Sequence, residues 1–164
     1  MSVLTPGKLP PELLQRLLTS YPRTDPRVIV GPAVGEDAAI IEMGDRYLIA
    51  KSDPITFATD AIGYYAVVVN ANDIATRGGR PKWFLATLLL PERTTSVALV
   101  ESIFAQISEA CQAFGITVVG GHTEVTYGLD RPILSGHMLG EVDAAGLIST
   151  SGAQIGDVLR VICD

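Results

Sequence analysis

Apolar residues recur at steps of three and four along two long segments of the chain, which is the spacing of one face of an α-helix. The clearer of them, residues 95–115, carries one apolar stripe and ends at a glycine. The other, residues 62–79, is apolar almost throughout and ends in a glycine pair, which is typical of helix termination. A shorter amphipathic pattern covers residues 9–21, where two prolines suit a first helical turn. We therefore expect three helices.

Short apolar runs bounded by turn residues predict strands before and between the long helices. AAIIEM and RYLIAKS flank a Gly44-Asp45 turn and predict a β-hairpin. Another strand is expected to end at Pro91, ITVVGG predicts a buried strand that ends in glycines, and RPILSGHMLGEV predicts a further strand. Strands joined both by hairpins and by helical crossovers predict an α+β fold with a mixed sheet and helices on one face.

The composition narrows the class of protein. The chain has 164 residues, of which 48% are hydrophobic and 18% charged, whereas ordinary globular chains carry roughly 25% charge. A small domain this apolar is expected to have faces that its own core does not use, which indicates oligomerisation or a partner domain.

Charge and targeting signals exclude further classes of protein. The net charge of −6, without a basic run, argues against nucleic acid as a partner. No signal peptide or membrane-length apolar run is present, so a cytoplasmic protein that does not span a membrane is expected.

The two cysteines indicate neither a disulfide framework nor a zinc site. Cys111 and Cys163 both lie in apolar periodic stretches, and neither belongs to a CxxC pair. Both are therefore predicted to be buried core thiols.

Four acidic residues stand at the edges of predicted elements, namely Asp37, Asp53, Asp73 and Glu124. The antiparallel hairpin is expected to bring Asp37 and Asp53 to the same open end. Carboxylates at such scattered positions suit Mg²⁺, which often binds a few carboxylates together with phosphates and water. An isolated aspartate at a strand end is more often a cap or turn residue, so the pattern by itself leaves structural roles open.

Three further polar residues accompany these carboxylates. Asn70 and Asp73 are one turn apart on a predicted helix face, while Asn72 and Asp73 interrupt an otherwise apolar surface. Polar groups are costly to bury unpaired, so these residues are expected to face a site or to cap a neighbouring element. His122, in GGHTE, is either a ligand contact or proton carrier, or a hydrogen-bonded histidine at a strand end.

Several segments together resemble the superfamily of aminoimidazole ribonucleotide synthetase, thiamine-monophosphate kinase, selenophosphate synthetase and the hydrogenase maturation factor HypE. The matching segments are GEDAAII (35–41), SDPITF (52–57), DAIGYYAVVVNANDIATRGGRPKWF (60–84) and VVGGHTEV (118–125). Their order and spacing fit over about residues 31–142. The resemblance implies a PurM-like N-terminal ATP-binding domain over residues 1–150. It implies that residues 151–164 are a linker and the first strand of a truncated or absent second domain.

The resemblance also implies a site and an assembly. Asp37, Asp53 and Asp73 would be the metal ligands, holding ATP through Mg²⁺, and Asn70 and Asn72 would orient nearby groups. The domain would form a homodimer in which strands pair between subunits.

One position departs from the family pattern. His122 stands where many members carry an acidic residue, so Glu124 is a possible substitute. Both residues are therefore included among the expected ATP contacts.

The resemblance is strongest to HypE-like and synthase-related members. It implies an ATP-dependent enzyme that phosphorylates an amide-type oxygen of a small molecule or protein thiocarboxamide. The phosphorylated oxygen would then leave in a dehydration or cyclisation. Catalysis would depend largely on positioning the reactants and neutralising charge. Alternatives are a thiamine-monophosphate kinase-like phosphotransferase and a non-catalytic dimerisation module.

The cysteines bear on two branches of the family. Selenophosphate synthetases use a reactive cysteine or selenocysteine near the N-terminus, and no cysteine precedes Cys111 here, so selenophosphate synthesis is disfavoured. Cys163 lies in GDVLRVICD, which resembles the opening strand of a second domain and not the C-terminal cysteine of HypE. Because that domain normally closes the ATP site, these residues alone are expected to be inactive.

Overall fold

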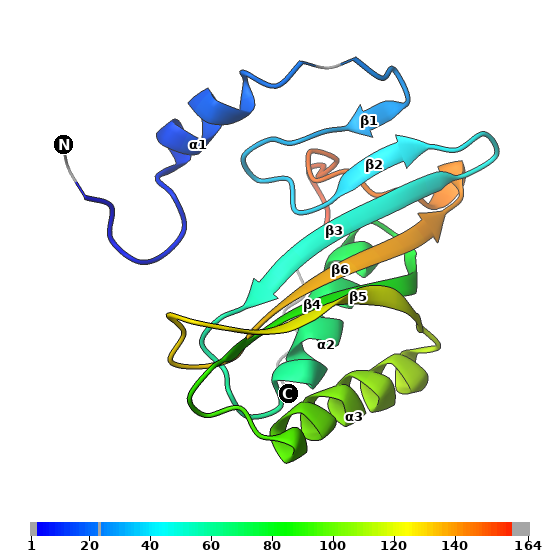
Figure 1. Cartoon of the computed structure of the whole chain (residues 1–164). Helices are drawn as coiled ribbons and strands as arrows, with labels where there is room; N and C mark the ends of the chain where they lie inside the picture. Colours follow the sequence, from blue (N-terminus) through cyan, green and yellow to red (C-terminus); the bar gives the residue numbers. More distant parts are fainter. Residues whose placement is uncertain (1–2, 23, 159–164) are drawn as a thin grey trace.

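A mixed sheet and two long helices make up most of the structure (Figure 1). The computed structural model describes residues 3–22 and 24–158. In chain order the helices and strands are α1 (Pro11–Leu18), β1 (Val28–Val30), β2 (Ala39–Glu42), β3 (Tyr47–Ile55), α2 (Ile62–Thr76), β4 (Arg80–Pro91), α3 (Val97–Phe114), β5 (Thr117–Thr126), β6 (Ile133–Val142) and a short 3-10 turn (Ala144–Gly146).

The six strands are ordered β1-β2-β3-β6-β4-β5. All neighbouring pairs are antiparallel except β4 and β5, which are parallel and joined through α3. Parallel neighbours require such a crossover, whereas the antiparallel β2 and β3 are joined by the tight Gly44-Asp45 turn. In Figure 1, α2 and α3 lie together on one side of the sheet. The predicted α+β fold with a mixed sheet and helices on one face is confirmed.

The core lies between α2 and the central strands. Ile62, Val67 and Ile74 of α2 are fully buried and belong to the same apolar cluster as Phe84 of β4 and Met138 of β6. Residues on a strand alternate between faces, so every second residue of β6 reaches this core, from Leu134 to Val142. The almost uniformly apolar sequence of α2 is thus explained by a helix packed on the sheet on one side and on α3 on another.

Close contact between α2 and β6 depends on a glycine. A Cβ added to Gly136 would collide with the side-chain amide of Asn70 and lie 2.8 Å from the Phe84 ring. The helix therefore approaches the strand closely at the level where polar residues of α2 meet the end of β3.

Helix α3 ends at the glycine that its sequence predicts and begins after a serine cap. The Ser96 side chain accepts a hydrogen bond from the Leu99 backbone amide at 3.1 Å, which satisfies a free donor of the first turn. At the other end Gly115 adopts φ 67°, a left-handed conformation that glycine reaches without strain. Cys111, in the last turns, is buried, as expected. Cys163 lies outside the described residues.

Strand β5 differs from expectation. It was predicted to be a buried strand ending at Gly121, but it continues to Thr126, and every residue from Thr117 to Val125 is exposed. The reason is its position, because β5 is the last strand of the sheet and α3 packs chiefly on α2. Apolar content alone does not distinguish such an edge strand from an internal one.

The two ends of the chain also differ in part from the predicted pattern. Helix α1 is shorter than the amphipathic segment and has no buried residue, and the short strand β1 was not predicted. Residues 151–158 form neither helix nor strand. Most of the segment predicted to open a second domain lies outside the described residues. Within the described part of the chain, no helix has the length and apolar character that a membrane span requires.

Candidate functional site

Three aspartates converge on one lysine. The Lys51 Nζ atom lies 2.7 Å from Asp73 Oδ2, 3.5 Å from Asp53 Oδ2 and 4.0 Å from Asp37 Oδ1. The Lys51 side chain is only 9% exposed, whereas the Asp73, Asp53 and Asp37 side chains are 22%, 40% and 66% exposed. We call these four residues the carboxylate cluster. The three aspartates are accessible to solvent and surround the ammonium group of Lys51, which is almost inaccessible to solvent.

The four residues of the cluster come from three parts of the fold, namely β3, α2 and the loop before β2. Lys51 and Asp53 are two residues apart on β3, pair with Met138 and Gly136 of β6, and therefore point to the helix-covered face of the sheet. Asp73 comes down from α2, and Asp37 comes from the loop that leads into β2. The antiparallel β2–β3 hairpin brings Asp37 and Asp53 to the same end, as its sequence predicted.

Electrostatics keep Lys51 protonated. Burial lowers the pKa of Lys51, but the hydrogen bond with Asp73 and the attraction of Asp73, Asp53 and Asp37 together outweigh it, so the pKa is raised above its ordinary value of 10.5. Three carboxylates and one ammonium leave the ionised cluster with a net charge of −2 (−3 plus +1). The cluster therefore attracts further positive charge.

Asn70 fixes the strand that carries two of these residues. Its side chain is fully buried, and its Nδ2 atom donates to the backbone oxygen of Asp53 at 3.2 Å and to that of Ala66 at 2.8 Å. The amide thus ties α2 to β3 at the cluster. Asn70 and Asp73 do share a helix face, and both meet β3. Asn72 lies instead on the exposed side of α2.

The chemistry of the cluster suits Mg²⁺, which prefers carboxylate oxygens supplemented by phosphate and water. Among the described residues, however, no three His, Cys, Asp or Glu side chains lie close enough to hold a metal ion as they stand. The ammonium group of Lys51 lies at the point on which the three carboxylates converge. Asp37, Asp53 and Asp73 are the carboxylates that lie nearest to this point.

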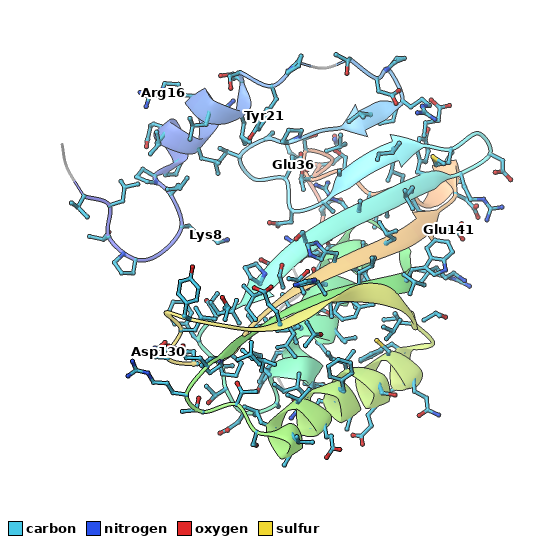
Figure 2. All side chains as sticks on the ribbon, viewed as in Figure 1. Lys8, Arg16, Tyr21, Glu36, Asp130 and Glu141 are labelled. Atoms are coloured by element: carbon cyan, nitrogen blue, oxygen red, sulfur yellow. The ribbon has the colours of Figure 1, made fainter. Side chains whose placement is uncertain are left out.

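A cavity of about 720 Å³ opens beside the cluster. Asp53 forms part of its wall, together with Lys8 of the N-terminal segment, Phe57 after β3 and Tyr65 of α2. In Figure 2 the Lys8 side chain extends from the N-terminal segment toward the sheet. Pockets for small molecules have volumes of roughly 300–1,000 Å³, so this cavity has the size for a nucleotide or a comparable substrate.

His122 and Glu124 are not brought to the cluster within one chain. They bond to each other, with 3.0 Å between His122 Nε2 and Glu124 Oε2, on the exposed strand β5. Two strands separate β5 from β3, which is a distance of about 14 Å at normal strand spacing. His122 pairs with Thr87, one row from the Asp53 row, so the two side chains point to opposite faces of the sheet.

Sequence reasoning missed Lys51, Glu36 and Arg77. Lys51 could have been found, because a charged residue two positions before Asp53 in an apolar strand must share its face. Arg77 is 2% exposed and pairs with Glu36, from a loop 41 residues earlier in the chain. Local sequence carries no signal for such a long-range pair.

Comparison with known proteins places this chain in a family. A family model described as AIR synthase related protein, N-terminal domain, matches residues 35–142. A thiamine-monophosphate kinase of Aquifex aeolicus is 27% identical over 143 residues, covering 82% of this chain and 45% of that protein. A hydrogenase expression/formation protein of Methanocaldococcus jannaschii is 30% identical over 161 residues, covering 94% and 48%. Other relatives include selenide, water dikinases and a carbamoyl dehydratase HypE.

A solved structure has the same fold. The complex of AaThiL, a thiamine monophosphate kinase from Aquifex aeolicus, with AMPPCP and TMP matches 89% of this chain and 44% of its own, with a TM-score of 0.70 and 28% identity. The chain thus spans less than half the length of these relatives. It belongs to the AIR synthase related protein family, with residues 35–142 corresponding to the family's N-terminal domain.

Proposed function

We propose that this chain is the ATP- and magnesium-binding part of an ATP-dependent enzyme that transfers a phosphoryl group to a substrate oxygen. The observation that carries the proposal is the convergence of Asp37, Asp53 and Asp73 on a single point beside a cavity of nucleotide size. The similarity to AaThiL also supports the proposal, because AaThiL was solved in complex with AMPPCP, an ATP analogue.

The chain's own residues would act by binding and positioning. Asp37, Asp53 and Asp73 would hold Mg²⁺, which when bound neutralises phosphate charge during phosphoryl transfer. Asn70 holds the Asp53 backbone in place through its hydrogen bond. A cation that occupied the carboxylates would displace the Lys51 ammonium group from them, and that group would then be available to a phosphate oxygen.

The substrate class that we propose first is an amide-type oxygen, as in a HypE-like enzyme acting on a small molecule or a protein thiocarboxamide. The relatedness to a hydrogenase expression/formation protein over 94% of this chain supports this choice. A thiamine-monophosphate kinase-like activity is the second candidate, favoured by the AaThiL structure with its TM-score of 0.70. Assays of ATP turnover by the whole enzyme, with thiamine monophosphate or with a protein thiocarboxamide as acceptor, distinguish the two.

We also propose that the domain acts as a homodimer through its exposed edge strand. β5 presents ten residues at the end of the sheet, including Val118, Val119 and Val125 at 47%, 52% and 57% exposure. Long apolar edge strands are normally covered or paired. Pairing of β5 with a second subunit would surround His122 and Glu124 with new neighbours, which is the arrangement in which they could contribute to an ATP site.

Calorimetric titration with AMPPCP in the presence and absence of Mg²⁺ tests the binding function. Wild-type protein is expected to bind only with Mg²⁺, and Asp53→Asn and Asp73→Asn are each expected to weaken binding at least about tenfold. Asp45→Asn is the matched control, because Asp45 is 79% exposed at the hairpin turn and lies outside the cluster.

Magnesium-independent binding, or equal affinity in all four proteins, would contradict the proposal. If instead Asp53→Asn and Asp73→Asn abolish nucleotide binding but leave cellular function intact, the chain is a non-catalytic dimerisation module.

A further inference from the structure

A second ion pair, between the buried Arg77 and the partly buried Glu36, lies next to the carboxylate cluster. Arg77, at the end of α2, is 2% exposed, and its guanidinium group pairs with the Glu36 carboxylate. A buried guanidinium group is costly without a partner, and Glu36 is its salt-bridge partner in the described part of the chain. The pair therefore fixes the position of the Glu36 side chain and of the loop that carries it.

The same loop and the same helix supply the cluster. Glu36 is adjacent to Asp37 in the sequence, and Arg77 follows Asp73 by four residues, which places both on one face of α2. Asp73 and Asp37 are linked through Lys51, and one turn further along Arg77 holds Glu36. The loop is thus attached to α2 at two consecutive residues, once through a lysine and once through an arginine.

A third segment joins this contact. Thr150 Oγ1 donates to Glu36 Oε1 at 2.5 Å, and the Ile148 amide donates to the Arg77 backbone oxygen at 3.0 Å. Figure 2 shows Glu36 beside the segment that follows β6. Glu36 therefore accepts hydrogen bonds from two separate parts of the chain, one through each of its carboxylate oxygens.

Asp37 itself has little support of its own. Its side chain is 66% exposed and lies 4.0 Å from Lys51, the longest of the three contacts that the lysine makes with aspartates. We propose that Glu36, held by Arg77 and Thr150, is a positioning residue that sets the place of Asp37 in the carboxylate cluster. Through the hydrogen bond of Thr150 to Glu36, the segment after β6 also helps to position Asp37. This inference rests on the proposed function for its consequence in ligand binding, although the contacts themselves do not.

The double variant Glu36→Gln with Arg77→Met tests the proposal, because it removes both charges together and leaves neither buried alone. Magnesium-dependent AMPPCP binding is expected to weaken about tenfold. The matched control is Arg46→Met with Glu141→Gln, which removes an exposed ion pair at the far end of the same sheet. The control variant is expected to bind like wild type.

Non-additivity separates positioning from general loss of structure. If Glu36 acts through Asp37, the double variant combined with Asp37→Asn binds no more weakly than Asp37→Asn alone. A general structural defect would instead lower the affinity further. Thr150→Val is a milder change that keeps the ion pair and removes one hydrogen bond to Glu36, with an expected loss of about threefold. Unchanged affinity in Thr150→Val and in the folded double variant, or full additivity with Asp37→Asn, overturns the proposal.

Amide hydrogen exchange gives a readout that needs no ligand. The amide of residue 36 donates to the Ala33 backbone oxygen, and the amide of Ile148 donates to that of Arg77. In the double variant both amides are expected to exchange at least about tenfold faster, while the exchange rates of core amides of β6 are unchanged. If wild-type protein does not bind magnesium–AMPPCP, the proposed function fails, and exchange alone then decides the inference. Faster exchange at these two amides supports it, and wild-type rates at both overturn it.

Discussion

The ammonium group of Lys51 lies 2.7 Å from the carboxylate of Asp73, at the point where a divalent cation would be expected among three aspartates. The chain thus carries its own positive charge inside its candidate cation site. The aspartate side chains are between 22% and 66% exposed, so they contact water as well as the ammonium group. A metal ion that bound these carboxylates would therefore compete with Lys51 for the same oxygen atoms.

Lys51→Met is expected to raise the affinity for Mn²⁺ alone about tenfold, equivalent to about 1.4 kcal/mol. The variant removes the competing charge and changes the cluster from −2 to −3 (three carboxylates without the ammonium). The cost in folding stability is expected to be about 1 kcal/mol, because the carboxylates are partly solvated. Paramagnetic titration with Mn²⁺ measures the affinity, and Lys82→Met, at an exposed position of β4, is the control. Unchanged or weaker Mn²⁺ binding in Lys51→Met would show that the lysine does not occupy the cation position.

Gly136→Ala is expected to destabilise the protein by about 1–3 kcal/mol, since overpacking forces neighbouring groups to move. The added methyl group would meet the side-chain amide of Asn70, which in turn holds the Asp53 backbone. Gly31→Ala is the control, because its Cβ would make only an ordinary contact, 3.5 Å from a Val28 methyl. Denaturant unfolding of both variants is the measurement, and equal stability of the two would refute the close approach of α2 to β6.

The hairpin and the helix faces could be predicted because they depend on short-range patterns. Alternation along β3 and the turn at Gly44 place Asp37 and Asp53 together, and helical spacing places Asn70 and Asp73 on one face. These features follow from the periods of strand and helix, which the sequence carries directly.

The missed features depend on long-range packing. Glu36 and Arg77 are 41 residues apart in the sequence, and neither residue has a local pattern that indicates an ion pair. The exposure of β5 was missed for a related reason. Its apolar residues are the same in kind as those of an internal strand, and only the strand order, which places β5 at the edge, shows that they remain uncovered.

Cys111 is expected to resist alkylation in the native protein. Burial raises the pKa of the Cys111 thiol from 9.0 to about 11, and the thiolate is the reactive form. Because the folded pKa is the higher one, the neutral thiol contributes stability that is complete below about pH 9 and is lost as the pH rises through 11. Iodoacetamide labelling followed by mass spectrometry, in a Cys163→Ser background, measures the rate. Rapid labelling at pH 8 without unfolding would contradict the buried position of the thiol.

Val125→Lys is expected to weaken self-association at least about tenfold if the dimer forms through β5. Val125 is 57% exposed on this edge strand, and a lysine there would place a charge in the proposed interface, where charges are depleted. Val97→Lys is the matched control, because Val97 is 75% exposed at the start of α3, away from the strand. Sedimentation equilibrium of the two variants and of wild type gives the dissociation constants. A dimer that survives Val125→Lys unchanged, or that dissociates equally with Val97→Lys, would place the interface elsewhere than on β5.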